Sequence, residues 1–255
     1  MPRLAHKTAF VTGGAAGFGE GIVRRFVAEG ARVLIADLDL ARGESLVAQL
    51  GAAQARAVRC DVSQRGDVEA AVEACVQAFG VPDIVVNNAG TTHRNGPMLD
   101  VDEASFDRIF AVNVKSIFHT THAVLPRWRA RPAGPAGAVI VNIGSTAGIR
   151  PRPGLSWYNA SKGAVNVLSK SMAAELGAEG IRVNAVCPVM GATNLIEQFL
   201  GAADTPEARA RVIAGIPLGR LSTAEDVAEA TLYLASDAAA FITGIELPVD
   251  GGRTI

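Results

Sequence analysis

Short apolar runs alternate with longer helical patterns along almost the whole chain, and this alternation limits the folds open to it. The runs are apolar throughout, which is typical of strands covered on both faces. They span Thr8–Thr12, Arg32–Ala36, Ala55–Cys60, Ile84–Asn87, Ala138–Ile143, Arg182–Val186 and Ile245–Val249. Between them, apolar residues recur every three or four positions, as in amphipathic helices. These segments are Gly19–Glu29, Ala41–Leu50, Val68–Phe79, Phe106–Val124, Tyr158–Leu176 and Ala224–Ala235.

Alternating strands and helices imply right-handed crossovers and a parallel sheet. The predicted fold class is α/β: a single doubly wound Rossmann domain over residues 1–255, with a seven-stranded, mostly parallel sheet flanked by helices on both faces. Gly30, Gly80 and Gly180 each directly follow a helical pattern, where a left-handed residue ends a helix. Val189–Pro217 has no strand pattern and is long enough to form a lid. Its apolar residues at helical spacing predict one short amphipathic helix closing over a substrate.

The net charge is −1, and lysine and arginine are spread along the chain. This balance argues against binding to nucleic acid or to an anionic membrane surface, so the expected partner is a small molecule. Cys60, Cys75 and Cys187 are widely spaced and form no CxxC pattern, which favours buried thiols in a reducing compartment. The sequence has neither a leader-like apolar segment at its start nor a long uncharged apolar run. We therefore expect a cytoplasmic protein.

A glycine-rich loop joins the first strand to the first helix, in the segment TGGAAGFG that begins at Thr12. Glycine lets the backbone approach a pyrophosphate closely, and the first amides of the helix bind its negative charge. A strand, loop and helix in this order are the context of a dinucleotide site, although the spacing is GxxxGxG instead of GxGxxG. The residues expected to contact the cofactor here are Gly13, Ala16, Gly17, Phe18 and Gly19.

Polar and small residues follow the next three strands, at the edge where open α/β sheets bind ligands. Asp37 can hydrogen-bond both ribose hydroxyls of an adenosine, and its charge repels a 2′-phosphate, which favours NAD over NADP. It could also cap the following helix. Asp61 and Val62 could bracket the adenine. The run Asn88, Ala89 and Gly90 can pass close beside the cofactor, or it could form a purely structural turn.

Tyr158 and Lys162 are four residues apart in a helical segment, so their side chains leave the same helix face. A phenol has an ordinary pKa of about 10 and is a poor base at neutral pH unless a nearby cation stabilises the phenolate. The pair therefore predicts a proton-transfer device in which Lys162 lowers the pKa of Tyr158. The alternative is an ordinary Tyr–Lys pair on a helix surface.

Together these motifs resemble the classical short-chain dehydrogenase/reductase family over essentially the whole chain. TGGAAGFG and NNAG match its cofactor motifs, and Asn113, Ser145, Tyr158 and Lys162 match its catalytic tetrad in order and spacing. Pro188 and Thr193 match a further family motif, except that Val189 stands where glycine is usual, which could add an apolar wall to the pocket.

The resemblance implies a role for each matched residue. Tyr158 would exchange a proton with the alcohol while hydride passes to the nicotinamide, and Ser145 would bind the substrate oxygen. Lys162 would also hold the nicotinamide ribose, Asn113 would anchor a water that leads protons to solvent, and Thr193 with the Val189 amide would meet the carboxamide. Asn113 could instead cap backbone at a helix kink, and Ser145 could be a turn residue.

The leading hypothesis is an NAD-dependent secondary alcohol dehydrogenase or carbonyl reductase acting on a small to medium, mostly uncharged substrate. The alternatives are a 3-oxoacyl-thioester ketoreductase using NADPH and a cofactor-sensing binding protein without turnover. No metal-ligand set is expected, and His119 and His122 are expected to face solvent or an interface. The apolar circumference of Phe106–Val124 and Tyr158–Leu176, which includes Ala164, Val165 and Leu168, favours a homodimer or, as the resemblance implies, a homotetramer.

The substrate pocket is expected to draw mainly on loops. Its candidate residues are Thr91, His93, Arg94, Thr146, Ala147, Leu155, Val189, Met190, Asn194, Leu195 and Phe199.

Overall fold

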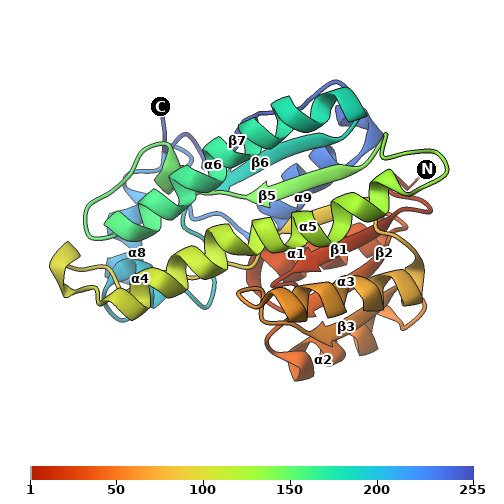
Figure 1. Ribbon diagram of the computed structural model, residues 1–255. Coiled ribbons are helices and arrows are strands. Elements are labelled where there is room, and N and C mark those ends of the chain that lie inside the picture. The colour runs from red at the N-terminus through yellow and green to blue at the C-terminus, as the bar shows by residue number, and fades with distance from the viewer. Residues whose placement is uncertain (1) are drawn as a thin grey trace.

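Seven parallel strands form one sheet in the computed structural model, which describes residues 2–255 (Figure 1). The strands are β1 (Thr8–Thr12), β2 (Arg32–Asp37), β3 (Ala55–Arg59), β4 (Ile84–Asn87), β5 (Val139–Ile143), β6 (Arg182–Pro188) and β7 (Glu246–Val249). Their order is β3-β2-β1-β4-β5-β6-β7, and every neighbouring pair is parallel. The order in which the chain adds strands therefore reverses between β1 and β4, and such a switch point creates a crevice at the carboxyl ends of the strands. The predicted doubly wound α/β fold is confirmed.

Helices cover both faces of this sheet (Figure 1). They are α1 (Gly17–Ala28), α2 (Leu40–Leu50), α3 (Arg65–Phe79), α4 (Glu103–Phe110), α5 (Ser116–Arg129), α6 (Ser156–Leu176), α7 (Ile196–Leu200), α8 (Pro206–Ile213) and α9 (Ala224–Ala235). The single helix expected over Phe106–Val124 is wrong in one respect: a π-helical turn, Ala111–Lys115, separates α4 from α5.

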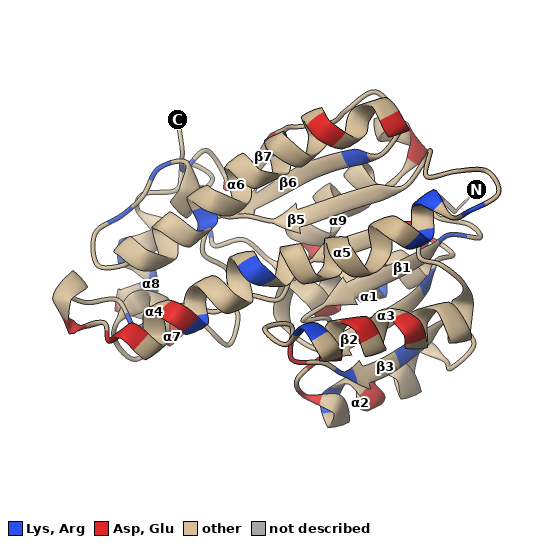
Figure 2. Cartoon of the chain, viewed as in Figure 1, with Lys and Arg blue, Asp and Glu red and all other residues tan. Residues whose placement is uncertain are grey.

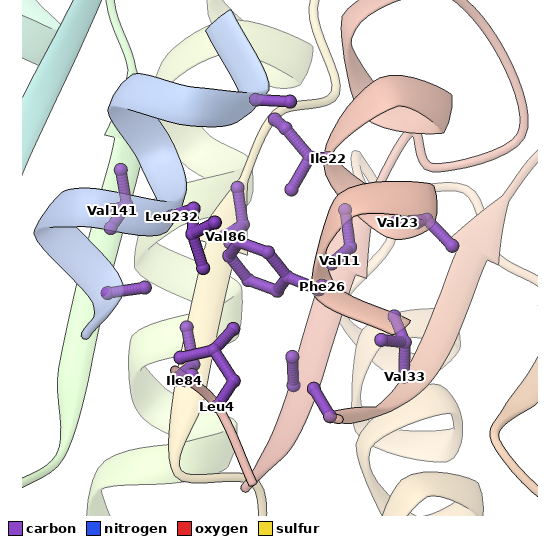
Figure 3. Packing of buried hydrophobic residues seen from close by; sticks show 14 of the residues in the cluster. Leu4, Val11, Ile22, Val23, Phe26, Val33, Ile84, Val86, Val141 and Leu232 are labelled. Atoms are coloured by element: carbon purple, nitrogen blue, oxygen red, sulfur yellow. The ribbon is translucent and has the colours of Figure 1, made fainter. Parts of the chain in front are cut away.

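Two apolar cores lie on opposite faces of the sheet, and successive strand residues enter them alternately. In β2, Val33 and Ile35 pack under α1, α2 and α9, whereas Leu34 packs under α3, α5 and α6. Figure 3 shows the first core, where Phe26 of α1 and Leu232 of α9 lie over the strands. Full burial of such a side chain stabilises the fold by about 1.5–3 kcal/mol. Burial on both faces explains why the central strands β1, β4 and β5 are buried along their whole length, whereas the edge strands β3 and β7 are partly exposed.

A third, smaller apolar cluster lies under the segment predicted to form the lid. Val189, Ile196, Ile216 and Leu221 are buried together there. The segment holds two helices, α7 and α8, instead of the one expected, because local signals divide it. Gly201 ends α7 in a left-handed conformation, with φ 70°. α8 then begins with a proline in its first turn, after a threonine N-cap whose side chain accepts from the Ala208 amide at 3.2 Å.

A buried chain of polar side chains ties the centre of the sheet to α5 and α6. Asn87 of β4 donates to the Asn142 side chain of β5 at 2.8 Å and accepts from Thr120 of α5 at 2.8 Å. Asn142 in turn donates to the Ser169 hydroxyl of α6 at 2.9 Å. Because a buried polar group is costly unless it is hydrogen-bonded, these contacts fix the position of α6 against the sheet.

Acidic and basic residues are interspersed over the helices and loops (Figure 2). Across residues 2–255, none of the helices has the length and apolar character needed to cross a bilayer.

Candidate active site

A cavity of about 460 Å³ opens at the carboxyl ends of the strands. Most of the residues that the sequence indicates line it: Gly13, Ala16, Gly17, Phe18, Asp37, Asp61, Val62, Asn88, Ala89, Gly90, Ser145, Tyr158, Lys162, Pro188, Val189 and Thr193. The cavity lining omits Gly19 and Asn113, which lie behind it and support the residues that form it. The fold thus brings together residues that are spread over some 180 positions of sequence, from Gly13 to Thr193.

The glycine loop is packed so closely on itself and on the residues that follow β4 that side chains would not fit at Gly13 and Gly19. A Cβ on Gly19 would lie 2.0 Å from the Gly13 carbonyl oxygen, and one on Gly13, which has φ 61°, would lie 2.8 Å from Cα of Ala89. The Asn88 side chain donates to the Thr12 and Gly13 carbonyls at 2.9 and 2.8 Å, which fixes the loop. α1 begins beside the cavity, and its N-cap residue Ala16 makes no side-chain capping bond. Its first amides are therefore suited to bind a phosphate.

Asp37, the last residue of β2, and Asp61, which follows β3, both line the cavity. The Asp37 carboxylate accepts from the Ala15 amide at 2.9 Å and from the Asp39 amide at 3.0 Å, so it braces the glycine loop. Each oxygen keeps a second lone pair for a ribose hydroxyl. The helix-capping alternative for Asp37 is wrong, because Asp39 caps α2 by accepting from the Arg42 amide. Asp61 accepts from the amide and hydroxyl of Ser63 at 2.9 and 2.7 Å.

One expected contact at the nicotinamide end is wrong. The Val189 amide donates to the Val249 carbonyl at 3.2 Å, so the pairing of β6 with β7 already uses it, and it is not free to meet a carboxamide. Val189 still lines the cavity as an apolar wall, as its replacement of glycine suggested. Thr193 also lines the cavity, and its methyl carbon would lie 3.4 Å from a Cβ on Gly17, so this segment reaches across to the glycine loop.

Ser145, Tyr158 and Lys162 meet in the middle of the cavity wall. Ser145 follows β5 and caps a 3-10 turn by accepting from the Ala147 amide at 3.0 Å, so the turn role and the site role coexist. Tyr158 and Lys162 lie on the first turns of α6 and are both buried. The Lys162 ammonium donates to the Ile143 carbonyl at 2.7 Å, which anchors it beside the end of β5.

The acid–base properties of this group differ from the expectation. Burial raises the pKa of Tyr158 to about 12, and the Ser145 hydroxyl and the Arg152 guanidinium oppose this rise. Burial lowers the pKa of Lys162 to about 8. The prediction that Lys162 brings the phenol to a low pKa is therefore not met by this geometry, because desolvation outweighs every charge near the ring. The phenol is placed to hold a proton at neutral pH.

Asn113 lies in the π-helical turn between α4 and α5, and its side chain makes three hydrogen bonds. Its amide group donates to the Thr91 carbonyl at 3.0 Å and to the Ser161 hydroxyl at 2.9 Å, and its oxygen accepts from the Thr91 amide at 2.8 Å. The side chain therefore binds the backbone of Thr91 at a helix irregularity, as the alternative to a catalytic role predicted. Through Ser161, Asn113 also fixes α6 next to Lys162.

His119 lies in a different environment from the one expected from the sequence. It is buried, not solvent-facing, and its Nδ1 lies 3.1 Å from the Val62 carbonyl oxygen. It therefore holds the loop that follows β3 from the side of α5. The spacing along the helix gave no sign of this contact, because its partner lies 57 residues away. His122 is exposed, as expected.

The substrate end of the cavity is partly as predicted. Nine of the expected residues line it: Thr91, Thr146, Ala147, Leu155, Val189, Met190, Asn194, Leu195 and Phe199. His93 and Arg94 stand outside the lining, since the Nδ1 of His93 lies 2.9 Å from the Arg94 carbonyl and the Arg94 guanidinium donates to the Gly201 carbonyl at 2.8 Å. The cavity lining also contains four arginines that no sequence motif indicated: Arg108, Arg150, Arg152 and Arg253.

The three thiols of the chain and the possible metal ligands of the described residues can be placed in the same way. The three cysteines are free and buried, and burial raises the pKa of each thiol to about 12. Residues 2–255 contain no group of three or more histidine, cysteine or acidic side chains arranged to hold a metal ion.

Comparison with known proteins connects this site to redox enzymes. A family model described as enoyl-(acyl carrier protein) reductase matches residues 13–254. A 4-formylbenzenesulfonate dehydrogenase of Comamonas testosteroni is 47% identical over 254 residues, covering 99% of both chains. A 2-(S)-hydroxypropyl-CoM dehydrogenase of Xanthobacter autotrophicus is 42% identical over 255 residues, covering 99% of this chain and 98% of that protein.

A solved structure is similar over its whole length. It is a 3-ketoacyl-(acyl-carrier-protein) reductase from Brucella melitensis complexed with NADH, with a TM-score of 0.92 and 43% sequence identity. The alignment covers 99% of this chain and 100% of that chain, so the two share the fold throughout.

Proposed function

The chain belongs to the short-chain dehydrogenase/reductase family and is an oxidoreductase acting on CH–OH groups, and we propose that it uses NAD(H) to interconvert a secondary alcohol and its ketone. One observation carries this proposal. The glycine loop with Asp37 and the group Ser145, Tyr158 and Lys162 line a single cavity, so a dinucleotide held by the first set would present its nicotinamide to the second.

Different residues of the cavity would bind different parts of the cofactor. The α1 amides and the glycine loop suit the pyrophosphate, Asp37 suits the adenosine ribose, and Asp61 and Val62 suit the adenine. Lys162 suits the nicotinamide ribose. When bound, NAD supplies the hydride acceptor and NADH the hydride donor.

Residues of the chain would bind the substrate oxygen and transfer its proton. The Ser145 hydroxyl can hydrogen-bond the substrate oxygen, where negative charge develops during reduction. The Tyr158 phenol can give that oxygen a proton, and as phenolate it can remove the alcohol proton in oxidation. The Lys162 ammonium, anchored on the Ile143 carbonyl, supplies positive charge beside these groups.

Reduction of a 3-oxoacyl thioester is the second candidate, because the solved relative from Brucella melitensis is named for that activity. The Asp37 carboxylate repels the 2′-phosphate of NADPH and so argues against an NADPH-dependent ketoreductase. The solved relative is complexed with NADH, and a ketoreductase that uses NADH would be compatible with Asp37. A binding protein without turnover is disfavoured because all four residues of the family's tetrad are present. We assign the enzyme to the cytoplasm, since its three thiols are free and buried.

Absorbance at 340 nm would test the proposal, with purified protein, NAD or NADH, and a panel of alcohols, ketones and one 3-oxoacyl thioester. Turnover of a simple alcohol or ketone supports the proposed function, and turnover of the thioester alone favours the second candidate. If no substrate of the panel changes the absorbance while NADH binds, a binding protein becomes the better account.

Cofactor choice should depend on Asp37. Two like charges at ~4 Å repel by about 4 kcal/mol at an effective dielectric of 20, so the carboxylate disfavours a 2′-phosphate. The double variant Asp37→Ser with Leu38→Arg should raise kcat/KM for NADP about a hundredfold and weaken NAD, because Leu38 is exposed at the cavity edge. Asp39→Ser, which keeps an N-cap, is the control and should leave the preference unchanged. A wild-type enzyme that prefers NADP would contradict this assignment.

The segment Val189–Pro217 should act as a lid over the substrate. Its small apolar cluster is separate from the two main cores, which leaves α7 and α8 tied to the rest by few buried contacts. Limited proteolysis should cut this segment first in the free enzyme, and NAD with substrate should protect it. Equal protection without ligands would instead show a permanently docked element.

The enzyme should be a homotetramer built on the outer faces of α5 and α6, which cover the same face of the sheet (Figure 1). Phe118 of α5 and Val167 of α6 are 50% and 62% exposed, which is costly on a monomer. Val165, expected on this surface, is instead buried in the core. Light scattering at low micromolar concentration should give about four times the 26.4 kDa chain mass. A mass near that of one chain would refute assembly.

A further inference from the structure

Positive charge is concentrated at the substrate end of the cavity. Arg150 and Arg152 come from the loop before α6, and Arg253 comes from the segment after β7; all three line the cavity together with Ser145 and Tyr158. Figure 2 shows basic residues in the loop that leads into α6. The acidic residues in the lining are Asp37, which ends β2, and Asp61, which follows β3; both strands lie on the other side of β1. The carboxylates and these arginines thus occupy opposite ends.

Arg152 is held in place beside the catalytic tyrosine. Its guanidinium donates to the Phe199 carbonyl of α7 at 2.6 Å, and its own carbonyl accepts from the Asn159 side chain at 2.9 Å. The Phe199 ring lies edge-on to the Tyr158 ring, with centroids 5.1 Å apart. One hydrogen bond uses only one of the five N–H donors of a guanidinium, so the others are available to a ligand.

Arg253 and Arg152 both line the cavity. Burial lowers the pKa of Arg152, and the positive charge of Arg253 lowers it further. Arg150 fixes the segment that carries Arg253, because its guanidinium donates to the Arg253 carbonyl at 2.9 Å. Within residues 2–255, Arg152 and Arg253 form no ion pair with a carboxylate. Two neighbouring, partly buried cations without an acidic partner are costly unless an anion joins them.

We propose that Arg152 and Arg253 together bind an anionic group of the substrate, a carboxylate or a sulfonate, while Ser145 and Tyr158 engage its alcohol or carbonyl oxygen. Both anions offer the oxygen atoms that a guanidinium binds with paired hydrogen bonds. Leu155, Phe199 and Met190 line the cavity as well, which suits an apolar or aromatic spacer between the two polar ends of the substrate. This inference rests on the proposed function and replaces the expectation of a mostly uncharged substrate.

A charge-matched series of ketones tests the proposal. The members are 4-acetylbenzoate, 4-acetylbenzenesulfonate, neutral 4-acetylbenzamide and cationic (4-acetylphenyl)trimethylammonium, each assayed with NADH. The wild type should show a kcat/KM for at least one anionic member about 30- to 100-fold above that for the amide, with the cation lowest. The ratio between the two anions decides between carboxylate and sulfonate. Equal kcat/KM across the series would overturn the proposal.

Variants locate the effect at the two arginines. Arg152→Leu and Arg253→Leu should each remove most of the preference for the anion, chiefly by raising KM, and Arg152→Lys should retain part of it. Arg56→Leu removes one charge from an exposed position on β3 and should preserve the preference. If Arg152→Leu and Arg253→Leu lower the activity on anionic and neutral ketones by the same factor, the arginines only hold α7 and the C-terminal segment, and the proposal is wrong.

Direct binding separates this inference from the proposed function. In calorimetric titration, the wild type should bind benzoate or benzenesulfonate more tightly than benzamide, and Arg253→Leu should abolish the difference. If no ketone is turned over but this binding difference is found, the proposed function fails and the anion site stands. If turnover occurs and the wild type binds the anions no better than benzamide, the anion site fails alone.

Discussion

Tyr158→Phe is expected to lower kcat for alcohol oxidation and ketone reduction by about 10³- to 10⁴-fold. The substitution removes only the hydroxyl that exchanges a proton with the substrate, and the ring can still lie against Phe199. NAD binding and the melting temperature should therefore change little. Steady-state kinetics, cofactor titration and thermal unfolding measure the three quantities on one protein preparation.

Tyr233→Phe is the matched control, because Tyr233 is the other tyrosine of the chain and is 40% exposed on α9. It should retain full activity. The pH dependence offers a second check on the wild type. A phenol whose pKa burial raises to about 12 keeps its proton at neutral pH, so reduction should be level there and oxidation should rise with pH. Near-normal turnover by Tyr158→Phe would end this mechanism.

Lys162→Met is expected to lower kcat about 10³-fold and to weaken NAD binding about tenfold. Methionine fills a similar volume, but it removes both the charge beside Tyr158 and the donor anchored on the Ile143 carbonyl. Kinetics and cofactor titration should show both losses. Lys170→Met lies two turns further along α6, is solvent-exposed, and should change neither. A Lys162→Met enzyme with unchanged NAD affinity and activity restored at high pH would refute the ribose role.

The strands could be predicted to within two residues at each end, most directly where they are buried on both faces. Apolar residues such as Val33, Leu34 and Ile35 enter the two cores in turn, so local sequence carries the whole signal. The break between α4 and α5 could not be predicted in this way. It occurs at Asn113, whose partners Thr91 and Ser161 are 22 and 48 residues away.

In the site, too, features set by neighbouring residues could be predicted, and those set by residues far apart in the sequence could not. The glycine loop and the Tyr158–Lys162 pair lie within short segments whose spacing already indicates their chemistry. The engagement of the Val189 amide depends on β7, which is 60 residues further along the chain, and nothing near Val189 reveals it. Arg152 and Arg253 likewise line one cavity only because the fold brings the segment before α6 and the final segment together. The proposed preference for an anionic substrate therefore could not be predicted from the local sequence.

The raised pKa of the phenol means that Tyr158 carries its proton at neutral pH when no ligand is bound. Since Tyr158 holds its proton there, the site is set up to donate it to a carbonyl oxygen, and Ser145 is placed to share the charge that forms. Oxidation requires the phenolate, which the positive charge of Lys162 and of a bound nicotinamide would favour. The in vivo direction then follows the relative supply of NADH and NAD.

Transfer of a deuterium label tests the central claim most directly. A secondary alcohol deuterated at its carbinol carbon is incubated with the enzyme and NAD, and the mass of the NADH formed is measured. Direct hydride transfer in this cavity predicts NADH one mass unit heavier, formed by the wild type and by Tyr233→Phe but at a rate about 10³-fold lower by Tyr158→Phe. NADH without deuterium, or no NADH from any alcohol that the enzyme binds, would contradict the account.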